Sequence, residues 1–153
     1  MDKSPSDTIF DKILRDEIPN WKVWQDDKHV AFLTPFPNTP GVTIVIPKTN
    51  PGDYVFDVAD DVYIDLLKAT KIVAKALEKV FNTKIALIFE GTGVPYLHAK
   101  LYPMHNVYNF DESKMPSEPV FTQDYQGYLI TQSGPKMDDT ELKDLQQRII
   151  STF

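Results

Sequence analysis

One stretch constrains the fold more than any other, Val94-Pro95-Tyr96-Leu97-His98-Ala99-Lys100-Leu101-Tyr102-Pro103-Met104-His105. Gly91-Thr92-Gly93 comes before it and Pro103 lies near its end, so it is expected to leave a turn and to stop abruptly. In a β-strand, successive side chains point to opposite faces. The pattern therefore predicts a strand with two unlike faces: Leu97, Ala99 and Leu101 on an apolar face, and Tyr96, His98, Lys100 and Tyr102 on a face of polar-tipped side chains.

The remaining patterns predict the elements that pack around this strand. Apolar residues at intervals of three and four predict a long helix over about 60–81, whose lysines would form a solvated face. A short helix through about Arg15, capped by Ser6 or Asp7, and a C-terminal helix that begins after Asp138 are also expected. Further strands are predicted at 21–25, 29–33, 42–46 and 84–89, with a short one at 128–131. Strands without βαβ alternation predict an α+β protein with an antiparallel sheet of about five strands.

Length and composition narrow the possible classes of protein. A chain of 153 residues fits one domain with a sizeable core. It contains no cysteine, which excludes disulfides and thiol catalysis and is consistent with the cytoplasm. The polar N-terminus and the lack of a long apolar run predict neither a secretory signal nor a membrane span. A net charge of −6, with only Arg15 and Arg148 as arginines, disfavours binding of long nucleic acid.

The central stretch resembles the strand of the histidine-triad (HIT) family of nucleotide hydrolases and transferases, which reads His-apolar-His-apolar-His-apolar. Here the sequence is Tyr96-Leu97-His98-Ala99-Lys100-Leu101, so the family's nucleophile maps to His98. Residues 8–19 resemble the family's opening helix, and residues 31–35 and 40–48 resemble its central hairpin. The resemblance implies one HIT-like domain over 1–153, with a core at about 8–105, an extended arm or lid at 106–127 and a C-terminal strand and helix at 128–153. It also implies a homodimer in which the long helix and the following strand meet their symmetry mates.

Two side chains carry the catalytic hypothesis. The resemblance makes His98 a nucleophile. A neutral imidazole keeps a lone pair for this role if its other ring nitrogen donates a hydrogen bond to a backbone carbonyl. The alternative is a structural histidine packed in the sheet. Lys100 occupies the position that contacts phosphate in the family, or it is a lysine that extends to solvent from the sheet edge. His105 either folds back toward the site or belongs to a surface loop.

The resemblance also assigns a nucleoside pocket, whose residues are equally compatible with an ordinary core. Thr34 stands where the family has a ribose-binding aspartate, and Phe89 stands where it has an asparagine. A short Gly91-Thr92-Gly93-Val94 segment replaces the family's glycine-glutamine-serine/threonine phosphate loop. No metal or cofactor is expected, since two histidines without a carboxylate cluster do not make a ligand set. The predicted nucleotide-binding residues are Ile9, Phe10, Ile13, Phe32, Leu33, Thr34, Gly91, Gly93 and Tyr96.

Three functions remain open at this point. The leading hypothesis is a hydrolase or transferase of nucleoside phosphates, phosphoramidates or dinucleoside polyphosphates that forms a nucleotidyl-histidine intermediate. The second is a HIT-fold protein that binds a nucleotide or another phosphate with little or no turnover. The third is an interaction protein whose 106–126 arm contacts a partner.

Overall fold

The structure, a computed structural model, describes residues 7–105 and 134–153. Five strands form one sheet in the order β1-β2-β3-β5-β4, and every neighbouring pair is antiparallel. This confirms the predicted α+β class with its five-stranded antiparallel sheet. In chain order the elements are α1 (Ile9–Leu14), β1 (Lys22–Gln25), β2 (His29–Leu33), β3 (Thr43–Pro47), α2 (Asp60–Phe81), β4 (Ile85–Glu90), β5 (His98–Pro103) and α3 (Asp139–Ile150).

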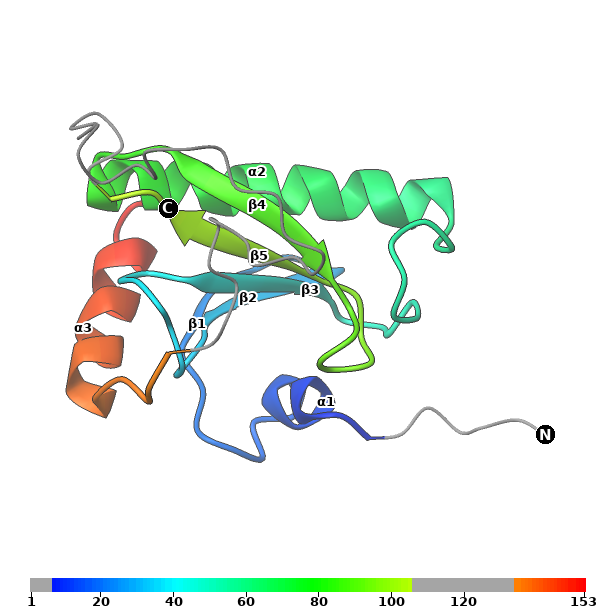
Figure 1. Cartoon of the computed structure of the whole chain (residues 1–153), viewed down its shortest axis with the longest axis horizontal. Coiled ribbons are helices and arrows are strands. Elements are labelled where there is room, and N and C mark those ends of the chain that lie inside the picture. The colour runs from blue at the N-terminus through cyan, green and yellow to red at the C-terminus, as the bar shows by residue number, and fades with distance from the viewer. Residues whose placement is uncertain (1–6, 106–133) are drawn as a thin grey trace, which may run out of the picture.

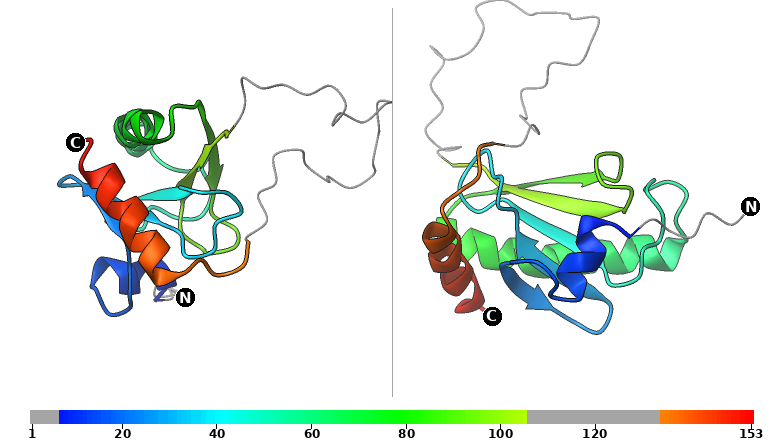
Figure 2. Two further views of the ribbon diagram at one scale, coloured as in Figure 1. Left: turned by 90° about the vertical axis from the view of Figure 1, so that its left-hand side faces the viewer. Right: turned by 90° about the horizontal axis from the view of Figure 1, so that it is seen from below.

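The sheet separates two hydrophobic clusters of different size. The long helix α2 lies along one face and α1 lies on the opposite side of the sheet (Figure 1). Buried residues of α2 and α3 share the larger cluster with one face of the sheet, whereas α1 shares a smaller cluster with the other face. The helix α3 packs against β1 and the end of α2, as the two further views show (Figure 2).

The strand β5 has the two faces that the sequence predicts. Leu97, Ala99 and Leu101 are at most 1% exposed and belong to the cluster that contains the buried residues of α2. The strand begins later than expected, at His98 instead of Val94. The reason lies in the backbone: the Leu97 N–H donates to the carbonyl of Gly52, which belongs to a loop and not to a neighbouring strand.

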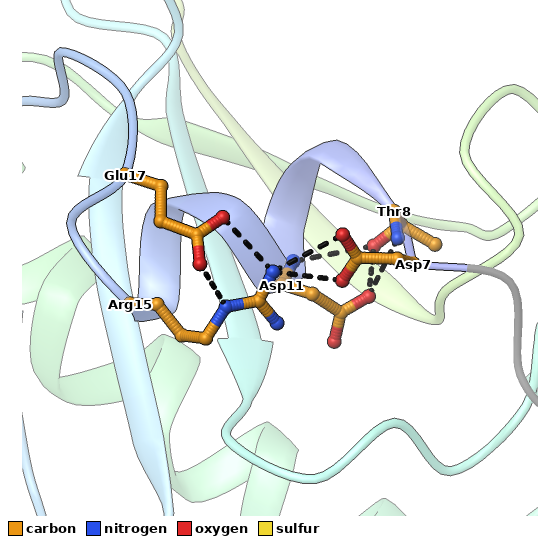
Figure 3. Close-up of polar contacts among 5 residues, drawn as sticks. All are labelled: Asp7, Thr8, Asp11, Arg15 and Glu17. Atoms are coloured by element: carbon orange, nitrogen blue, oxygen red, sulfur yellow. Dashed lines mark hydrogen bonds and ion pairs between the residues drawn. The ribbon is translucent and has the colours of Figure 1, made fainter.

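The first helix is capped by Thr8, so the predicted caps at Ser6 or Asp7 are wrong. The Thr8 side chain accepts a hydrogen bond from the Asp11 N–H, and the Asp11 carboxylate accepts one from the Thr8 N–H, which together form a capping box. Asp7 instead binds Arg15, which also binds Glu17 (Figure 3). These contacts hold both ends of α1 in place. Asp138 caps α3 as predicted and accepts from the N–H groups of the two residues that follow Asp139.

Some predictions fall on residues outside the described ranges, namely the 106–127 arm and the short strand at 128–131. The long helix matches its predicted range of 60–81. Its predicted solvated face is exposed at Lys68, Lys71, Lys75 and Lys79. Within the described residues, no helix has the length and the apolar character that crossing a membrane requires.

Candidate functional site

His98 is the first residue of β5 and is only 2% exposed. Its ring packs edge-to-face against Phe10, with 5.0 Å between the ring centroids. Its Nδ1 lies 2.7 Å from the backbone oxygen of Tyr96. A carbonyl oxygen only accepts hydrogen bonds, so Nδ1 must carry the hydrogen. The other ring nitrogen, Nε2, is therefore the one that keeps a lone pair in the neutral imidazole.

The surroundings of His98 keep its ring neutral. Burial is the main influence and lowers the pKa of His98 below its usual value of 6.5. The hydrogen bond to Tyr96 raises the pKa, the nearby Lys100 ammonium lowers it and the Glu90 carboxylate raises it, but the sum remains a decrease. At neutral pH the imidazole is therefore uncharged, which is the form that can act as a nucleophile.

His98 lines a cavity of about 440 Å³ that α1 and the sheet enclose. This volume falls in the range of about 300–1,000 Å³ that is usual for small-molecule sites. Most of its lining is apolar, as a base-binding pocket requires. The cavity brings together these predicted site residues: Ile9, Phe10, Ile13, Phe32, Leu33, Thr34, Gly93, His98 and Lys100.

The cavity also contains residues that the sequence interpretation missed. Trp21 precedes β1, and Phe36 and Asn38 follow β2 in the proline-rich segment; all three line the cavity. Tyr102 lines it from β5, on the face that carries His98. The only sequence signal for Phe36 is that an aromatic side chain occurs in a loop that lacks the periodic spacing of core residues. Tyr102 was placed on the polar face of β5, but its position along the cavity depends on tertiary packing.

Tyr96, the residue at the first triad position, does not line the cavity. Its side chain is fully buried in the α1-side cluster, and its hydroxyl donates to the carbonyl oxygen of Pro47. Burial raises the pKa of this phenol far above its usual value of 10. The backbone carbonyl of Tyr96 is the group that reaches His98. Tyr96 thus positions His98 through its main chain while its side chain anchors the preceding turn.

Gly91 does not line the cavity either, but it sets the shape of the loop before His98. A Cβ atom at Gly91 would lie 1.8 Å from the carbonyl oxygen of Asp53, so no larger residue fits there. The same loop is held by the Leu97 N–H bond to Gly52 and by the side-chain amide of Asn50, which donates to the Pro95 carbonyl at 3.2 Å. Gly91 lets the 91–97 loop pack directly on the 50–53 loop. This contact fixes the position at which β5 begins.

A glutamate that the sequence interpretation did not consider lies beside His98. Glu90 ends β4 and is the cross-strand partner of His98. Its carboxylate lies 2.6 Å from Nζ of Lys100, and the two side chains are 28% and 17% exposed. Both residues line the cavity. The Lys100 ammonium is therefore held by a carboxylate of its own chain.

In this register Phe89, which stands where the family has an asparagine, does not face the cavity. Phe89 pairs with Ala99, and its side chain packs on the α2 side, with its ring 5.9 Å from that of Tyr63. Its neighbour Glu90 is the residue of β4 that faces the cavity. Sequence order alone could not show this, because a one-residue change of register exchanges the faces of every side chain.

His105 lies apart from the cavity. Its Nε2 is 2.9 Å from the carbonyl oxygen of Pro40, and its ring packs edge-to-face on Phe81 of α2. It is not among the residues that line the cavity. His105 is therefore held by a hydrogen bond and a ring contact just after the end of β5, away from the cavity.

A metal site requires several His, Cys, Asp or Glu side chains that converge on one point. Within residues 7–105 and 134–153, no three or more His, Cys, Asp or Glu side chains are grouped in a way that could hold a metal ion. In the cavity, His98 has Glu90 as its one carboxylate neighbour across the strands, and that carboxylate is paired with Lys100.

Comparison with known proteins agrees with the fold. The HIT domain model matches residues 15–107, so the chain belongs to the HIT family. It is 40% identical over 76 residues to a protein of Arabidopsis thaliana named adenylylsulfatase HINT1, a match that covers 50% of this chain and 52% of that protein. It is 38% identical over 79 residues to a 14 kDa zinc-binding protein of Zea mays, covering 52% of this chain and 60% of the maize protein.

A solved structure shows the same fold over a longer range. A hypothetical histidine triad nucleotide-binding protein of Sulfolobus tokodaii has a TM-score of 0.71, with 20% identity over 94% of this chain and 89% of that one. At this identity, the likeness concerns the fold alone. The matched region spans only about half to three fifths of the two curated relatives.

Proposed function

We propose that the cavity binds a nucleoside with its phosphoryl group at His98, and that the protein is a hydrolase or transferase of nucleoside phosphates, phosphoramidates or dinucleoside polyphosphates. The apolar residues of α1 and β2 would hold the base. The observation that carries the proposal is the state of His98: buried in a cavity wall, neutral, and with Nδ1 committed to the Tyr96 carbonyl. That arrangement leaves Nε2 as the ring nitrogen that can act as the nucleophile.

The proposed reaction has two steps at phosphorus. The Nε2 lone pair forms a bond to the α-phosphorus, while the bond from phosphorus to the leaving group breaks and the leaving group takes up a proton. Water then attacks the same phosphorus and releases a proton to the solvent, which balances the proton that the leaving group takes up. The phosphorus–nitrogen bond breaks, and the nucleoside monophosphate leaves with the neutral imidazole restored. Lys100 and the backbone amides near Gly93, which lines the cavity, would offset the charge that develops on the phosphoryl oxygens.

The decisive experiment looks for the intermediate. The protein is mixed with adenosine 5′-phosphoramidate or a dinucleoside polyphosphate, quenched in denaturant at a pH at which phosphorus–nitrogen bonds survive, and analysed by mass spectrometry. We expect a nucleotidyl adduct on the peptide that contains His98. His105→Asn, whose histidine contacts Pro40 and Phe81, is the matched control and should still form the adduct. If no adduct and no turnover appear across a broad panel of substrates, the enzyme hypothesis is wrong.

A specific contact favours a second candidate, a nucleotide- or phosphate-binding protein with little turnover. Lys100, which would assist phosphoryl transfer, is paired with Glu90 at 2.6 Å. Thr34 replaces the family's ribose-binding aspartate and lines the cavity with one hydroxyl. Nucleotides that stabilise the protein in a thermal-shift assay without being consumed would support this candidate, since a ligand that binds only the folded state raises its stability.

We also propose, from the family resemblance, that residues 1–153 form one domain, that the protein is a homodimer joined through α2 and β4, and that it acts in the cytoplasm. Leu87 on β4 and Ile64 and Ile72 on α2 are large apolar residues that are 40–48% exposed, as such an interface requires. Light scattering at micromolar concentration tests the assembly, and a monomer would contradict it.

A further inference from the structure

Two charged side chains line the cavity within the described residues, and they have opposite signs. They are Glu90 and Lys100, and the ion pair between them is 2.6 Å long. His98, which lies next to both, adds no charge at neutral pH because burial lowers its pKa. The described lining is therefore close to electrically neutral, although the proposed ligand is an anion.

The sheet and its loops hold Glu90 in this position. Glu90 faces His98 across the β4–β5 pair, and Ile88 faces Lys100, so Glu90 lies diagonally across from the lysine on the same face. The next residue, Gly91, packs against the Asp53 carbonyl with no space for a side chain. The backbone is thus confined directly after Glu90, and the carboxylate is held beside His98 by its ion pair with Lys100.

Both side chains are largely shielded from solvent, at 28% and 17% exposure. Charges in such a setting interact more strongly than in bulk water, where the dielectric constant is high. A phosphoryl group with one negative charge can share the Lys100 ammonium with Glu90. Each further negative charge on the ligand meets the Glu90 carboxylate without a second cation among the described lining residues.

We propose that Glu90 selects ligands by charge: by holding Lys100, it makes the cavity beside His98 accept a singly charged phosphoryl group, as in a phosphodiester or phosphoramidate, in preference to a terminal phosphate or a polyphosphate chain. The inference rests on the proposed function and deepens it by naming the substrate class. Glu90 acts here as a specificity-determining residue.

The test compares the affinity of ligands that share one nucleoside and differ in charge. Adenosine 5′-monophosphate methyl ester carries one negative charge, AMP carries about two at pH 7.5, and the methylene analogue of ADP carries more. Calorimetry at one fixed salt concentration would give the three affinities for wild type and Glu90→Gln. We expect wild type to prefer the methyl ester, and Glu90→Gln to shift the ratio toward the ADP analogue by roughly tenfold or more.

Two further variants sharpen the result. Glu78→Gln on α2 removes the same charge from an exposed ion pair of the same 2.6 Å length with Lys75, outside the cavity, and should leave the ratio unchanged. Lys100→Met leaves Glu90 without its cation and should shift the ratio the opposite way, further toward the methyl ester.

The outcomes separate this inference from the proposed function. If all three nucleotides bind but Glu90→Gln leaves their relative affinities as in wild type, selection by Glu90 is wrong while nucleotide binding stands. A preference of wild type for the ADP analogue would also overturn it. If no nucleotide binds to wild type or to any variant, the proposed function fails and this inference fails with it.

Discussion

The strand β5, together with Leu97 directly before it, has two faces built from alternate residues, and the two faces have different roles. Leu97, Ala99 and Leu101 meet α2 in a cluster whose members are almost fully buried. On the other face, His98 and Lys100 line a cavity of about 440 Å³, since the short helix α1 covers the sheet only in part. A 22-residue helix covers the first face, and a 6-residue helix covers the second. Among the described residues, the face covered by the longer helix is core, and the face covered by the shorter helix contains the cavity.

The two faces also differ in their polar side chains, which lie on the cavity face and have hydrogen-bond or ion-pair partners there. On the cavity side, His98 is bonded to a backbone carbonyl, Tyr96 to another, and Lys100 to Glu90. No buried side-chain polar atom in the described part of the chain lacks a hydrogen-bond partner. Polar side chains can therefore lie beside an apolar cavity without the cost of leaving a buried donor or acceptor unpaired. Substitutions on the cavity face should therefore affect mainly activity, and substitutions on the α2 face should affect mainly stability.

The largest expected effect is on activity and comes from the cavity face. His98→Ala removes the proposed nucleophile and should lower kcat by roughly 10³-fold or more. The fold should survive, because the change leaves the α2-side cluster intact. Turnover of adenosine 5′-phosphoramidate, with circular dichroism on the same sample, measures both. A variant that is well folded and nearly as active as wild type would contradict the nucleophile assignment.

The next effect is on stability and comes from the opposite face. Leu101→Ala leaves a cavity in the α2-side cluster, where Leu101 is 1% exposed, and should lower the free energy of unfolding by about 2–5 kcal/mol. Urea denaturation measures it. Ile150→Ala, at a site that is 40% exposed, is the control and should cost much less. Equal losses in the two variants would show that the α2 face is not the main core.

A smaller effect is expected at Lys100. Lys100→Ala removes a charged hydrogen-bonding group from the phosphoryl position and should weaken ligand binding by about 1–3 kcal/mol without abolishing turnover. Calorimetry and steady-state kinetics measure the two quantities. Restoring the family's residue at the position that lines the cavity, with Lys100→His, should raise the rate if the altered triad limits it. A complete loss of turnover in Lys100→Ala would make Lys100 as essential as His98.

The smallest effect is a dependence of stability on pH. Because burial lowers the pKa of His98 below 6.5, the unfolded chain takes up a proton on this residue at a higher pH than the folded protein does. The contribution of neutral His98 to stability is thus fully present above about pH 6.5 and is lost as the pH falls from there through the lowered pKa. Asp11 and Asp26 have pKa values below 3.8, so their contributions are lost at lower pH.

Urea denaturation at several pH values between 7.5 and 5 measures this dependence. His98→Asn keeps a polar side chain that does not titrate, and we expect it to reduce the slope in that window. A slope that is the same in wild type and His98→Asn would show that His98 is not the group responsible.

Much of the architecture follows from local pattern. Period-two alternation placed Leu97, Ala99 and Leu101 against the long helix, and the spacing of apolar residues located that helix at 60–81; the structure confirms both. These features follow from the sequence because the periods of a strand and a helix depend only on backbone geometry. Resemblance to the HIT family added the position of His98 on its strand, and the family assignment is confirmed.

Only the tertiary structure decided the contacts between segments that are distant in the chain or joined by loops whose conformation does not follow from local sequence. The packing of Gly91 on Asp53 and the bond from Leu97 to Gly52 set where β5 begins. The register of β4 on β5 turned Phe89 toward α2 and Glu90 toward His98, and it paired Glu90 with Lys100. A one-residue difference in that register would have reversed both faces of β4, and nothing in the local sequence specifies it.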